Sequence, residues 1–446
     1  MIYLDYASTT PIRQEVLQAY EKILKTYYAN ADSLHQAGRK VQSLLETSRA
    51  NIAQLFHVQP REIMFTSCAS EANNYALKGF ALANQQRGRH IITSCAEHSS
   101  IMSSAAQLQE VFGFEVTYLP LHADGTVHLE EVKKALRKDT ILVSIMCVNN
   151  ETGCINDIRT IANYVHAHSR AMVHSDLVQA LGKMELDLSF LDMATFSAHK
   201  IFGLKGSGLL YHRANVELLP LISAGQQEDG LRGGTSNAPT EIVFAKTLRL
   251  ALEEQAAHIA HVRKINDYAR SQLAQIPEID INSPQEALPF ILNFSCLCIG
   301  SEIMLNALDA KGFCVSAQST CNSKGKAISH VLLAMGKDEL HATHAVDFFG
   351  ELDECVKVLF RNRARQSSFA SAFAHSAMRR DRRTLLGLVA ASISFERFQA
   401  SFEVAAQLKE LSRCVLVALR QNEGAGSSKK RGAGAFFEAC VPSCRT

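Results

Sequence analysis

Short apolar runs alternate with amphipathic segments between about residues 37 and 346. The amphipathic segments, such as 129–136 and 158–166, repeat their apolar residues at the spacing of one helical face. The apolar runs have the length of buried strands. These runs cover 90–93, 115–119, 141–146, 171–174, 193–196 and 208–211. Strands that alternate with helices predict βαβ units, and therefore an α/β fold with a mostly parallel central sheet in a large domain.

The alternation stops near residues 218–234, where a loop contains several glycines. A long helix, roughly 240–276, is expected next, and an apolar run at 290–294 follows it. We therefore expect a second, smaller α+β domain beyond the long helix. The predicted boundaries are 16–260 for the large domain, 261–282 for a connecting helix and loop, and 1–15 together with 283–360 for the small domain.

The composition changes after Val346. Residues 347–446 hold 16 Lys and Arg against 10 Asp and Glu, whereas the whole chain has a net charge of only +2. The stretch 422–434 is rich in Gly, Ser and Lys, which is typical of disorder, while 385–399 has the pattern of an amphipathic helix. We predict that 361–446 is an atypical basic tail, partly disordered or helical, which serves as a solvated appendix or as a binding arm.

Composition argues against several classes of protein. An apolar content of 47% predicts substantial cores, and the small net charge offers no global field for nucleic acid or an anionic membrane. Twelve cysteines in 446 residues are too few for a disulfide scaffold, and no CxxC pair suggests a structural zinc site. The first residues lack the pattern of a signal peptide. We expect a cytoplasmic protein with no direct nucleic-acid partner, no membrane partner and no metal.

Known nucleotide and metal motifs are also missing from the sequence. Neither a dinucleotide fingerprint nor a Walker loop occurs, which argues against nucleotide enzymes of those classes. The histidine pairs His166/His168 and His341/His344 have no carboxylate or thiol motif nearby. Surface or capping roles are therefore expected for these histidines.

Three segments carry candidate chemistry. The run 65–74 ends an apolar stretch in small polar residues and opens a helix, which is a favourable place for a phosphate. Asp176 and Lys200 follow two successive predicted strands, at the sheet edge where open α/β folds bind ligands. A lysine there can form a Schiff base, and an aspartate facing a pyridine nitrogen keeps that nitrogen protonated. The alternatives are a surface lysine and a helix-capping aspartate.

Seven motifs, in order along the chain, resemble the pattern of cysteine desulfurases. These are class-V aminotransferase-like enzymes that use pyridoxal 5'-phosphate (PLP), so the resemblance implies the PLP-dependent transferase fold type I. It covers residues 1 to about 346. The motifs are Asp5–Pro11, Thr66–Asn73, Glu97 with His98, Val148–Gly153, Asp176 with Gln179, Ser197–Lys200 and Arg232–Thr235.

The resemblance also implies a role for each site residue. Lys200 would hold PLP covalently and then move the substrate's α-proton, and Asp176 would pair with the ring nitrogen. Gln179 would donate a hydrogen bond to the ring hydroxyl, and His98 would stack on the ring and act as acid or base. Asn150 would lie at the ring edge. The phosphate would be held by Ala69, Ser70, Ser197 and His199, and by Thr235 of a second subunit, which implies a homodimer.

Cys321 lies in a segment rich in Ser, Thr, Asn, Gln, Gly and Lys, a composition typical of a mobile loop. Lys324 and Lys326 would favour its thiolate. The resemblance implies that Cys321 attacks the sulfur of the cysteine–cofactor adduct and carries a persulfide to an acceptor, such as an iron–sulfur scaffold or a tRNA-thiolation enzyme. The other cysteines are expected to be small buried residues or simply exposed.

Asp347 interrupts the pattern. The family has an arginine near this position that grips the substrate carboxylate, and an aspartate there would repel that group. The chain has diverged toward another substrate, or its end has been replaced, or Arg361 or Arg363 supplies a substitute clamp. We favour replacement of the end, which predicts weak activity with free cysteine.

The main hypothesis is a cytoplasmic, homodimeric cysteine desulfurase that converts L-cysteine to L-alanine and passes sulfur to an acceptor. Two alternatives remain open. The chain is a selenocysteine lyase on the same scaffold, or it is a C-terminally altered, catalytically impaired homologue that still binds PLP.

Overall fold

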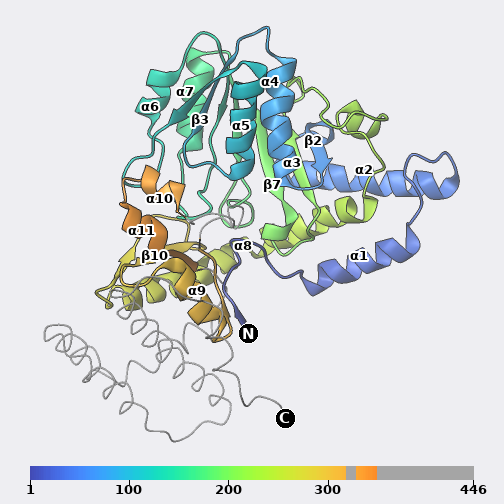
Figure 1. Ribbon diagram of the computed structural model, residues 1–446. Coiled ribbons are helices and arrows are strands. Elements are labelled where there is room, and N and C mark those ends of the chain that lie inside the picture. Colours follow the sequence, from blue (N-terminus) through green and yellow to red (C-terminus); the bar gives the residue numbers. More distant parts are fainter. Residues whose placement is uncertain (318–327, 349–446) are drawn as a thin grey trace, which may run out of the picture.

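The computed structural model describes residues 1–317 and 328–348, and its centre is a seven-stranded sheet (Figure 1). The strand order is β2-β8-β7-β6-β5-β3-β4. Only β8 runs against the other strands of this sheet, because it is antiparallel to both β2 and β7. The strands are β2 (Ile63–Thr66), β3 (His90–Ser94), β4 (Glu115–Leu119), β5 (Thr140–Ser144), β6 (Met172–Asp176), β7 (Met193–Ser197) and β8 (Gly208–His212). The predicted α/β fold with a mostly parallel sheet is confirmed.

The apolar runs of the sequence became strands with small differences at their ends. The run at 141–146 forms β5, but the strand stops at Ser144. The backbone N–H of Met146 donates to the Glu97 carboxyl group at 3.0 Å instead of to a neighbouring strand. The N–H groups of Ile145 and Cys147 still donate to carbonyls of β6, so the buried Glu97 side chain takes up only the donor on the other edge of the chain.

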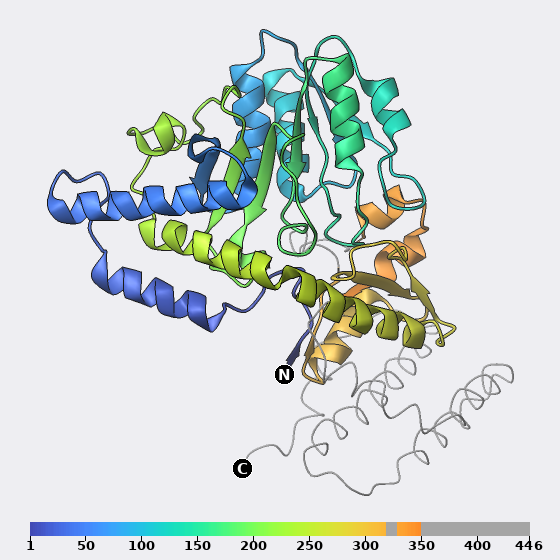
Figure 2. The same cartoon turned by 180° about the vertical axis from the view of Figure 1, so that it is seen from behind.

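Helices cover both faces of the sheet, and the two opposite views show different sets in front (Figures 1 and 2). One core contains Ile52, Val165 and Phe244, which come from α2, α7 and α8. The other contains Tyr75 and Ile101, from the helical run that starts at α3 and from α5. The helices are α1 (Gln14–Thr26), α2 (Gln36–Phe56), α3 (Ala69–Asn74), α4 (Phe80–Ala83), α5 (Ser99–Phe112), α6 (Leu129–Ala135), α7 (Ile158–His168) and α8 (Ala238–Leu273), with a π-helix (Tyr75–Gly79) joining α3 to α4. Short 3-10 turns occur at Pro60–Glu62, Ala198–Lys200 and Gln227–Gly230.

The long helix α8 leads from the large sheet to a smaller group of elements, which holds α9, α10, α11 and β10 (Figure 1). A three-stranded antiparallel sheet in the order β12-β10-β9 forms its centre. Its strand β9 lies within the segment predicted as a connecting helix and loop. The elements are β9 (Ile279–Ile281), β10 (Leu292–Cys296), α9 (Ser301–Asp309), β11 (Phe313–Cys314), α10 (His330–Ala334), α11 (Glu339–His344) and β12 (Ala345–Phe348).

The N-terminal segment links the small part to the large sheet. Strand β1 (Ile2–Tyr3) pairs in parallel with β11. The chain then crosses to the carboxyl ends of β6 and β7, where the backbone N–H of Thr10 donates to the carbonyl of His199 at 2.9 Å. This path brings the carbonyl groups of Ala7 and Ser8 next to Lys200.

Several predictions concern residues outside the described ranges. They include Cys321 with Lys324 and Lys326, the clamp candidates Arg361 and Arg363, and the tail 361–446. Within 1–317 and 328–348, no helix is both long and apolar enough to cross a membrane. In the same ranges, His, Cys, Asp and Glu side chains form no group of three or more placed to hold a metal ion.

Candidate active site

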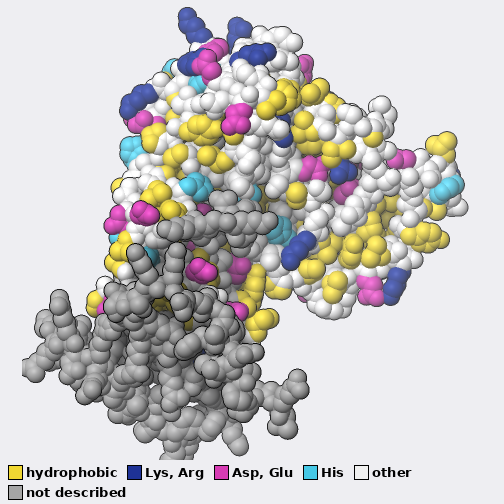
Figure 3. All heavy atoms as spheres, in the orientation of Figure 1, with side chains coloured by type: hydrophobic (Ala, Val, Ile, Leu, Met, Phe, Trp, Pro, Cys, Tyr) yellow, Lys and Arg dark blue, Asp and Glu magenta, His cyan; other side chains and the backbone are white. Residues whose placement is uncertain are grey.

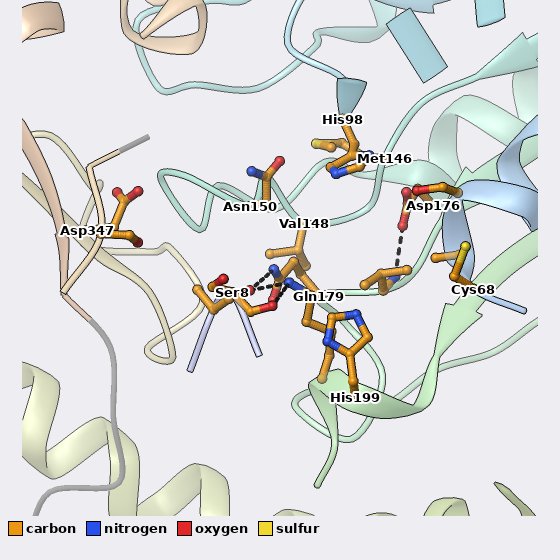
Figure 4. Close-up of a pocket in the computed structure, with 16 residues that line it drawn as sticks. Ser8, Cys68, His98, Met146, Val148, Asn150, Asp176, Gln179, His199 and Asp347 are labelled. Atoms are coloured by element: carbon orange, nitrogen blue, oxygen red, sulfur yellow. Dashed lines mark hydrogen bonds between the residues drawn. The ribbon is translucent and has the colours of Figure 1, made fainter. Parts of the chain in front are cut away.

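A cavity of about 250 Å³ opens at the carboxyl ends of β6 and β7 (Figure 4). Eight of the residues predicted to bind the cofactor line it together. The walls consist of Ala7, Ser8, Cys68, Ala69, Ser70, His98, Met146, Val148, Asn150, Asp176, Val178, Gln179, His199, Lys200, Ser316 and Asp347. Residues from distant parts of the chain thus converge at the sheet edge where open α/β folds bind ligands.

Lys200 stands at the end of the short helical turn that follows β7. Its Nζ donates to the backbone carbonyls of Ala7, at 2.5 Å, and Ser8, at 2.6 Å. The N-terminal segment therefore holds the amine in the cavity. Both of these contacts are with uncharged carbonyl groups, so the amine can leave them for a covalent partner without breaking an ion pair there.

Asp176 is the last residue of β6 and is buried. Its Oδ2 accepts a hydrogen bond from Asn73 Nδ2 at 2.7 Å, and its Oδ1 accepts one from the backbone N–H of Val178 at 3.0 Å. Asn73 also donates to the hydroxyl of Ser100. Helix α3 thus orients the carboxylate, a role for Asn73 that sequence reasoning did not assign.

Gln179 is held between two fixed partners. Its Oε1 accepts a hydrogen bond from Lys183 Nζ at 2.8 Å, and its Nε2 donates to the carbonyl of Ala7 at 3.0 Å. Because that carbonyl can only accept, the amide nitrogen must face it and the amide oxygen must face Lys183. Burial, and then the charge of Lys200, lowers the pKa of Lys183 to about 7. Sequence reasoning missed Lys183, whose one signal was its spacing of four residues from Gln179.

His98 precedes α5 and caps it. Its Nδ1 accepts a hydrogen bond from the backbone N–H of Ser100 at 3.2 Å and also contacts that residue's hydroxyl. Burial lowers the pKa of His98, which favours the neutral imidazole. The adjacent Glu97 is fully enclosed, and burial raises its pKa to about 8. A protonated carboxyl group therefore lies directly behind the cavity wall.

The start of α3 and Ser197 belong to the region predicted to hold a phosphate. Ala69 and Ser70 open α3 on one side of the cavity, and Gly208 of β8 lies against this turn. A Cβ atom added at Gly208 would lie 2.6 Å from the carbonyl carbon of Cys68 and 3.0 Å from the nitrogen of Ala69, so the missing side chain makes the approach feasible. The buried hydroxyl of Ser197 has no hydrogen-bond partner among the described residues. An anion with several acceptor oxygens would satisfy such a group, so the residues present fit a phosphate.

The two remaining phosphate candidates differ in their placement. His199 contacts the Thr9 hydroxyl at 3.1 Å, and burial, and then the charge of Lys200, lowers the pKa of His199 to about 4. It is therefore a neutral ring at the cavity wall. Thr235 is exposed and does not line the cavity of its own chain.

Asp347 lines the cavity at the side away from Asp176 (Figure 4). It lies in β12, where it is buried, and its Oδ1 accepts a hydrogen bond from Asn293 Nδ2 at 2.5 Å. Its backbone N–H donates to the carbonyl of Ser316 at 2.7 Å. Among the described residues, no arginine lines this cavity. The Asp347 carboxylate, which was expected near the substrate, therefore forms part of the cavity wall.

Comparison with known sequences gives consistent matches. The model of the aminotransferase class-V family matches residues 2–342. A cysteine desulfurase IscS of Dictyoglomus turgidum is 39% identical over 338 residues, which are 75% of this chain and 85% of that protein. A mitochondrial cysteine desulfurase of Candida albicans is 37% identical over 355 residues, covering 78% and 72% of the two chains.

Solved structures show the same likeness. A NifS-like protein superposes with a TM-score of 0.75 at 35% identity and covers 80% of this chain and 96% of its own. The structure of SspA in complex with cysteine gives a TM-score of 0.69 at 31% identity, with 78% and 98% coverage. The family model spans all seven strands of the large sheet and continues through β10 and α10 of the smaller part.

Proposed function

Because this chain belongs to the cysteine desulfurase family of class-V aminotransferases, we propose that it is a PLP-dependent enzyme that converts L-cysteine to L-alanine and transfers the sulfur by way of Cys321. The observation that carries the proposal is the convergence of Lys200 and Asp176, from the ends of neighbouring strands, in one cavity with His98 and Gln179. A lysine that can form a Schiff base and an aspartate that can pair with a pyridine nitrogen are the groups that the ring of PLP requires.

Four groups of this chain would hold PLP. The start of α3 and the Ser197 hydroxyl would accommodate the phosphate, Asp176 would pair with the ring nitrogen, and Gln179 Nε2 would donate to the ring hydroxyl. Asn73 keeps the Asp176 carboxylate oriented, and Lys183 keeps the Gln179 amide oriented. When bound, the cofactor attaches to the substrate amine and withdraws electrons from the carbon that loses its proton.

Lys200 and His98 would move protons in this cavity. Once Lys200 leaves the carbonyls of Ala7 and Ser8, its amine is free to take the proton from the substrate carbon. The lowered pKa of His98 keeps its imidazole neutral near pH 7, so it can accept a proton. Asp176 would pair with the ring nitrogen and would take no part in this transfer.

The assignment of Lys200 and Cys321 is tested by absorbance and by mass spectrometry. Lys200→Ala should lose the visible absorbance band of the bound cofactor, because the covalent attachment is gone. Cys321→Ala should keep the band and lose the persulfide formed after cysteine is added. A Lys200→Ala variant that keeps a normal, borohydride-reducible band would overturn the proposal. Selenocysteine turnover by Cys321→Ser would indicate a selenocysteine lyase instead.

Asp347 bears on the substrate. Its carboxylate lies in the cavity wall, so the α-carboxylate of free cysteine would meet a like charge there. We expect weak alanine release from free cysteine, and Asp347→Arg should raise kcat/KM by about tenfold or more, since one removed repulsion is worth at least about 1.4 kcal/mol. If Asp347→Arg leaves ordinary desulfurase turnover unchanged, Asp347 does not limit the reaction.

A homodimer and a sulfur acceptor complete the proposal. Large apolar side chains are exposed along α1 and in the loop between α1 and α2, and Figure 3 shows hydrophobic side chains gathered over this side. They include Leu17, Leu24, Tyr28 and Leu34, of which the last two are more than 80% exposed. Such a surface supports association with a second copy, whose Thr235 would reach the phosphate. The acceptor is proposed to be an iron–sulfur scaffold or a tRNA-thiolation enzyme in the cytoplasm.

A further inference from the structure

Two cysteine side chains meet at the end of β10, and neither lines the cavity described above. The Sγ atoms of Cys296 and Cys298 lie 3.6 Å apart. Cys296 is buried as the last residue of the strand, whereas Cys298 is exposed two residues further on. A buried thiol and a solvent-facing thiol therefore already touch.

The backbone holds this arrangement in place. The N–H of Ile299 donates to the carbonyl of Cys296 at 3.1 Å and closes a turn around Cys298. The N–H of Leu297 donates to the carbonyl of Glu278 at 2.8 Å, which ties the same turn to the segment before β9. Because both flanking amides are fixed, the two thiols stay near each other through the turn itself.

The two thiols differ in reactivity. The hydrogen bond from Cys296 lowers the pKa of the Cys298 thiol to about 7, and the same contact with burial raises the pKa of Cys296. At pH 7 the Cys298 thiol is therefore about half ionised, while Cys296 keeps its proton. By contrast, burial raises the pKa of Cys147 to about 12 and that of Cys154 to about 11.

We propose that Cys298 and Cys296 form a thiol-oxidation site for hydroperoxides, in which Cys298 reacts first and Cys296 resolves the product. The Cys298 thiolate attacks the outer peroxide oxygen, the O–O bond breaks, and one alcohol or water leaves with a proton from solvent. The Cys298 sulfenic acid is then attacked by Cys296 sulfur, which forms the disulfide and releases water. Overall, two thiols lose two electrons and two protons, and the hydroperoxide is reduced.

The geometry allows the second step. A disulfide needs an S–S distance of about 2.05 Å, so the two sulfurs must approach by roughly 1.5 Å. Cys298 is exposed, so its side chain can move without displacing core residues, while Cys296 stays anchored in β10. This site involves none of the PLP-binding residues, so it stands or falls independently of the proposed function.

Peptide mapping tests the proposal on the full-length protein. Trypsin cuts after Arg270 and after Lys311, and the peptide 271–311 contains Cys296 and Cys298 as its only cysteines. The reduced protein is treated with hydrogen peroxide, quenched with N-ethylmaleimide and digested. Peptide 271–311 should lose two hydrogen atoms in mass and take up no maleimide, and dithiothreitol should restore both labelling sites.

Three variants sharpen the result. Cys296→Ser should stop Cys298 at the sulfenic or higher acids, with added oxygen mass, and Cys298→Ser should leave Cys296 reduced. The matched control Cys314→Ser, in the same part of the fold, should still form the disulfide. Without peroxide, Cys298 should react with maleimide about tenfold faster than Cys314, since Cys298 is exposed and its pKa is lowered, whereas Cys314 is half-buried.

A peroxide dose is first chosen that oxidises Cys298 in Cys296→Ser. The proposal is wrong if, at that dose, peptide 271–311 of the wild type still takes up two maleimide labels. It is also wrong if Cys298 in the wild type reacts with peroxide no faster than Cys314. In the first case the thiols cannot join, and in the second case Cys298 has no special reactivity.

Discussion

Glu97 is a carboxyl group that the fold keeps away from water. The Ser94 hydroxyl donates to it at 2.6 Å and the Met146 N–H at 3.0 Å, which fixes the loop after β5 and the residue before His98. Burial raises its pKa from 4.5 to about 8, so the folded chain holds a proton that the unfolded chain releases above about pH 4.5. Glu97 therefore makes the fold sensitive to pH.

We predict that replacing Glu97 by glutamine removes this sensitivity. Between pH 4.5 and pH 8 the folded wild type binds more protons than the unfolded chain, so its stability falls as the pH rises. Glutamine keeps an acceptor for Ser94 and Met146 and does not titrate. The stability of the variant relative to the wild type should therefore rise by about 4 kcal/mol between pH 4.5 and pH 8, as measured by urea unfolding.

The exposed Glu110 on α5 gives a matched control. Glu110→Gln should follow the wild-type pH profile, because water solvates this side chain. Equal pH slopes for the wild type and Glu97→Gln would show that Glu97 is ionised in the folded chain.

Lys183 is predicted to act through Gln179. In Lys183→Met the Gln179 amide keeps the Ala7 carbonyl as acceptor but loses the donor that fixes its oxygen, so its NH₂ group would be held less firmly toward the ring hydroxyl of PLP. Affinity of the apo chain for PLP should fall about tenfold, in line with one lost hydrogen bond of about 1.4 kcal/mol. Absorbance titration measures this affinity.

A double variant separates this role from a general loss of packing. Gln179→Ala should cost a similar factor, and Lys183→Met combined with Gln179→Ala should cost no more than Gln179→Ala alone. If the losses of PLP affinity in the two single variants multiply in the double variant, Lys183 affects PLP binding independently of Gln179.

At the scale of elements, β8 and the first turn of α3 approach so closely that a side chain does not fit between them. We predict that Gly208→Ala pushes the turn away from β8, since the new Cβ would lie 2.6 Å from a backbone carbon. Stability should fall by about 1–3 kcal/mol, and affinity for PLP should fall with it because the phosphate pocket deforms. Denaturant unfolding and the absorbance titration measure the two effects.

Gly300, which precedes α9, is the control for this substitution. A Cβ there meets open space, and its φ of −61° suits any residue. Gly300→Ala should change stability by less than about 1 kcal/mol and leave PLP affinity alone. If both variants behave alike, the close approach at Gly208 does not shape the pocket.

The elements that could be predicted from the sequence are those with a clear period. The runs 115–119 and 193–196 became β4 and β7, and Asp176 and Lys200 were expected together because the carboxyl ends of parallel strands share one edge. Strands β9 and β11 contain three and two residues, too few to show a period.

Contacts between distant segments explain the residues that the sequence did not reveal. Asn73 meets Asp176 across 103 positions of chain, and Lys183 acquires its low pKa only through burial beside Lys200. Glu97 belonged to a recognised motif, but its buried, protonated state depends on Ser94 and Met146. No local pattern encodes these environments.

For the whole molecule, the exposed apolar side of α1 predicts a dimer. Leu17 and Leu24 lie seven positions apart and so share one face of the helix. Leu17→Glu combined with Leu24→Glu should convert the protein to a monomer, because burying two carboxylates in an apolar contact costs several kcal/mol. Sedimentation measures the mass of the particle. PLP affinity should also drop, because the monomer lacks the second copy whose Thr235 would reach the phosphate.

Val111 supplies the matched control, since it is 67% exposed on α5. Val111→Glu should leave the dimer intact. The prediction that two copies associate through α1 is wrong if the wild type is a monomer. It is also wrong if the dimer survives both substitutions in α1.

The pairing of β1 with β11 has a consequence for the order in which the site is built. A ribosome makes residues 63–212, which hold all seven strands of the large sheet, long before Phe313 and Cys314 exist to receive Ile2 and Tyr3. Until then the segment that carries Ala7 and Ser8 lacks its strand partner, and Ser316 has not yet bonded Asp5. A growing chain therefore holds Lys200 in an unfinished cavity while about a hundred further codons are read, and the wall that Ala7 and Ser8 form is completed only late in synthesis.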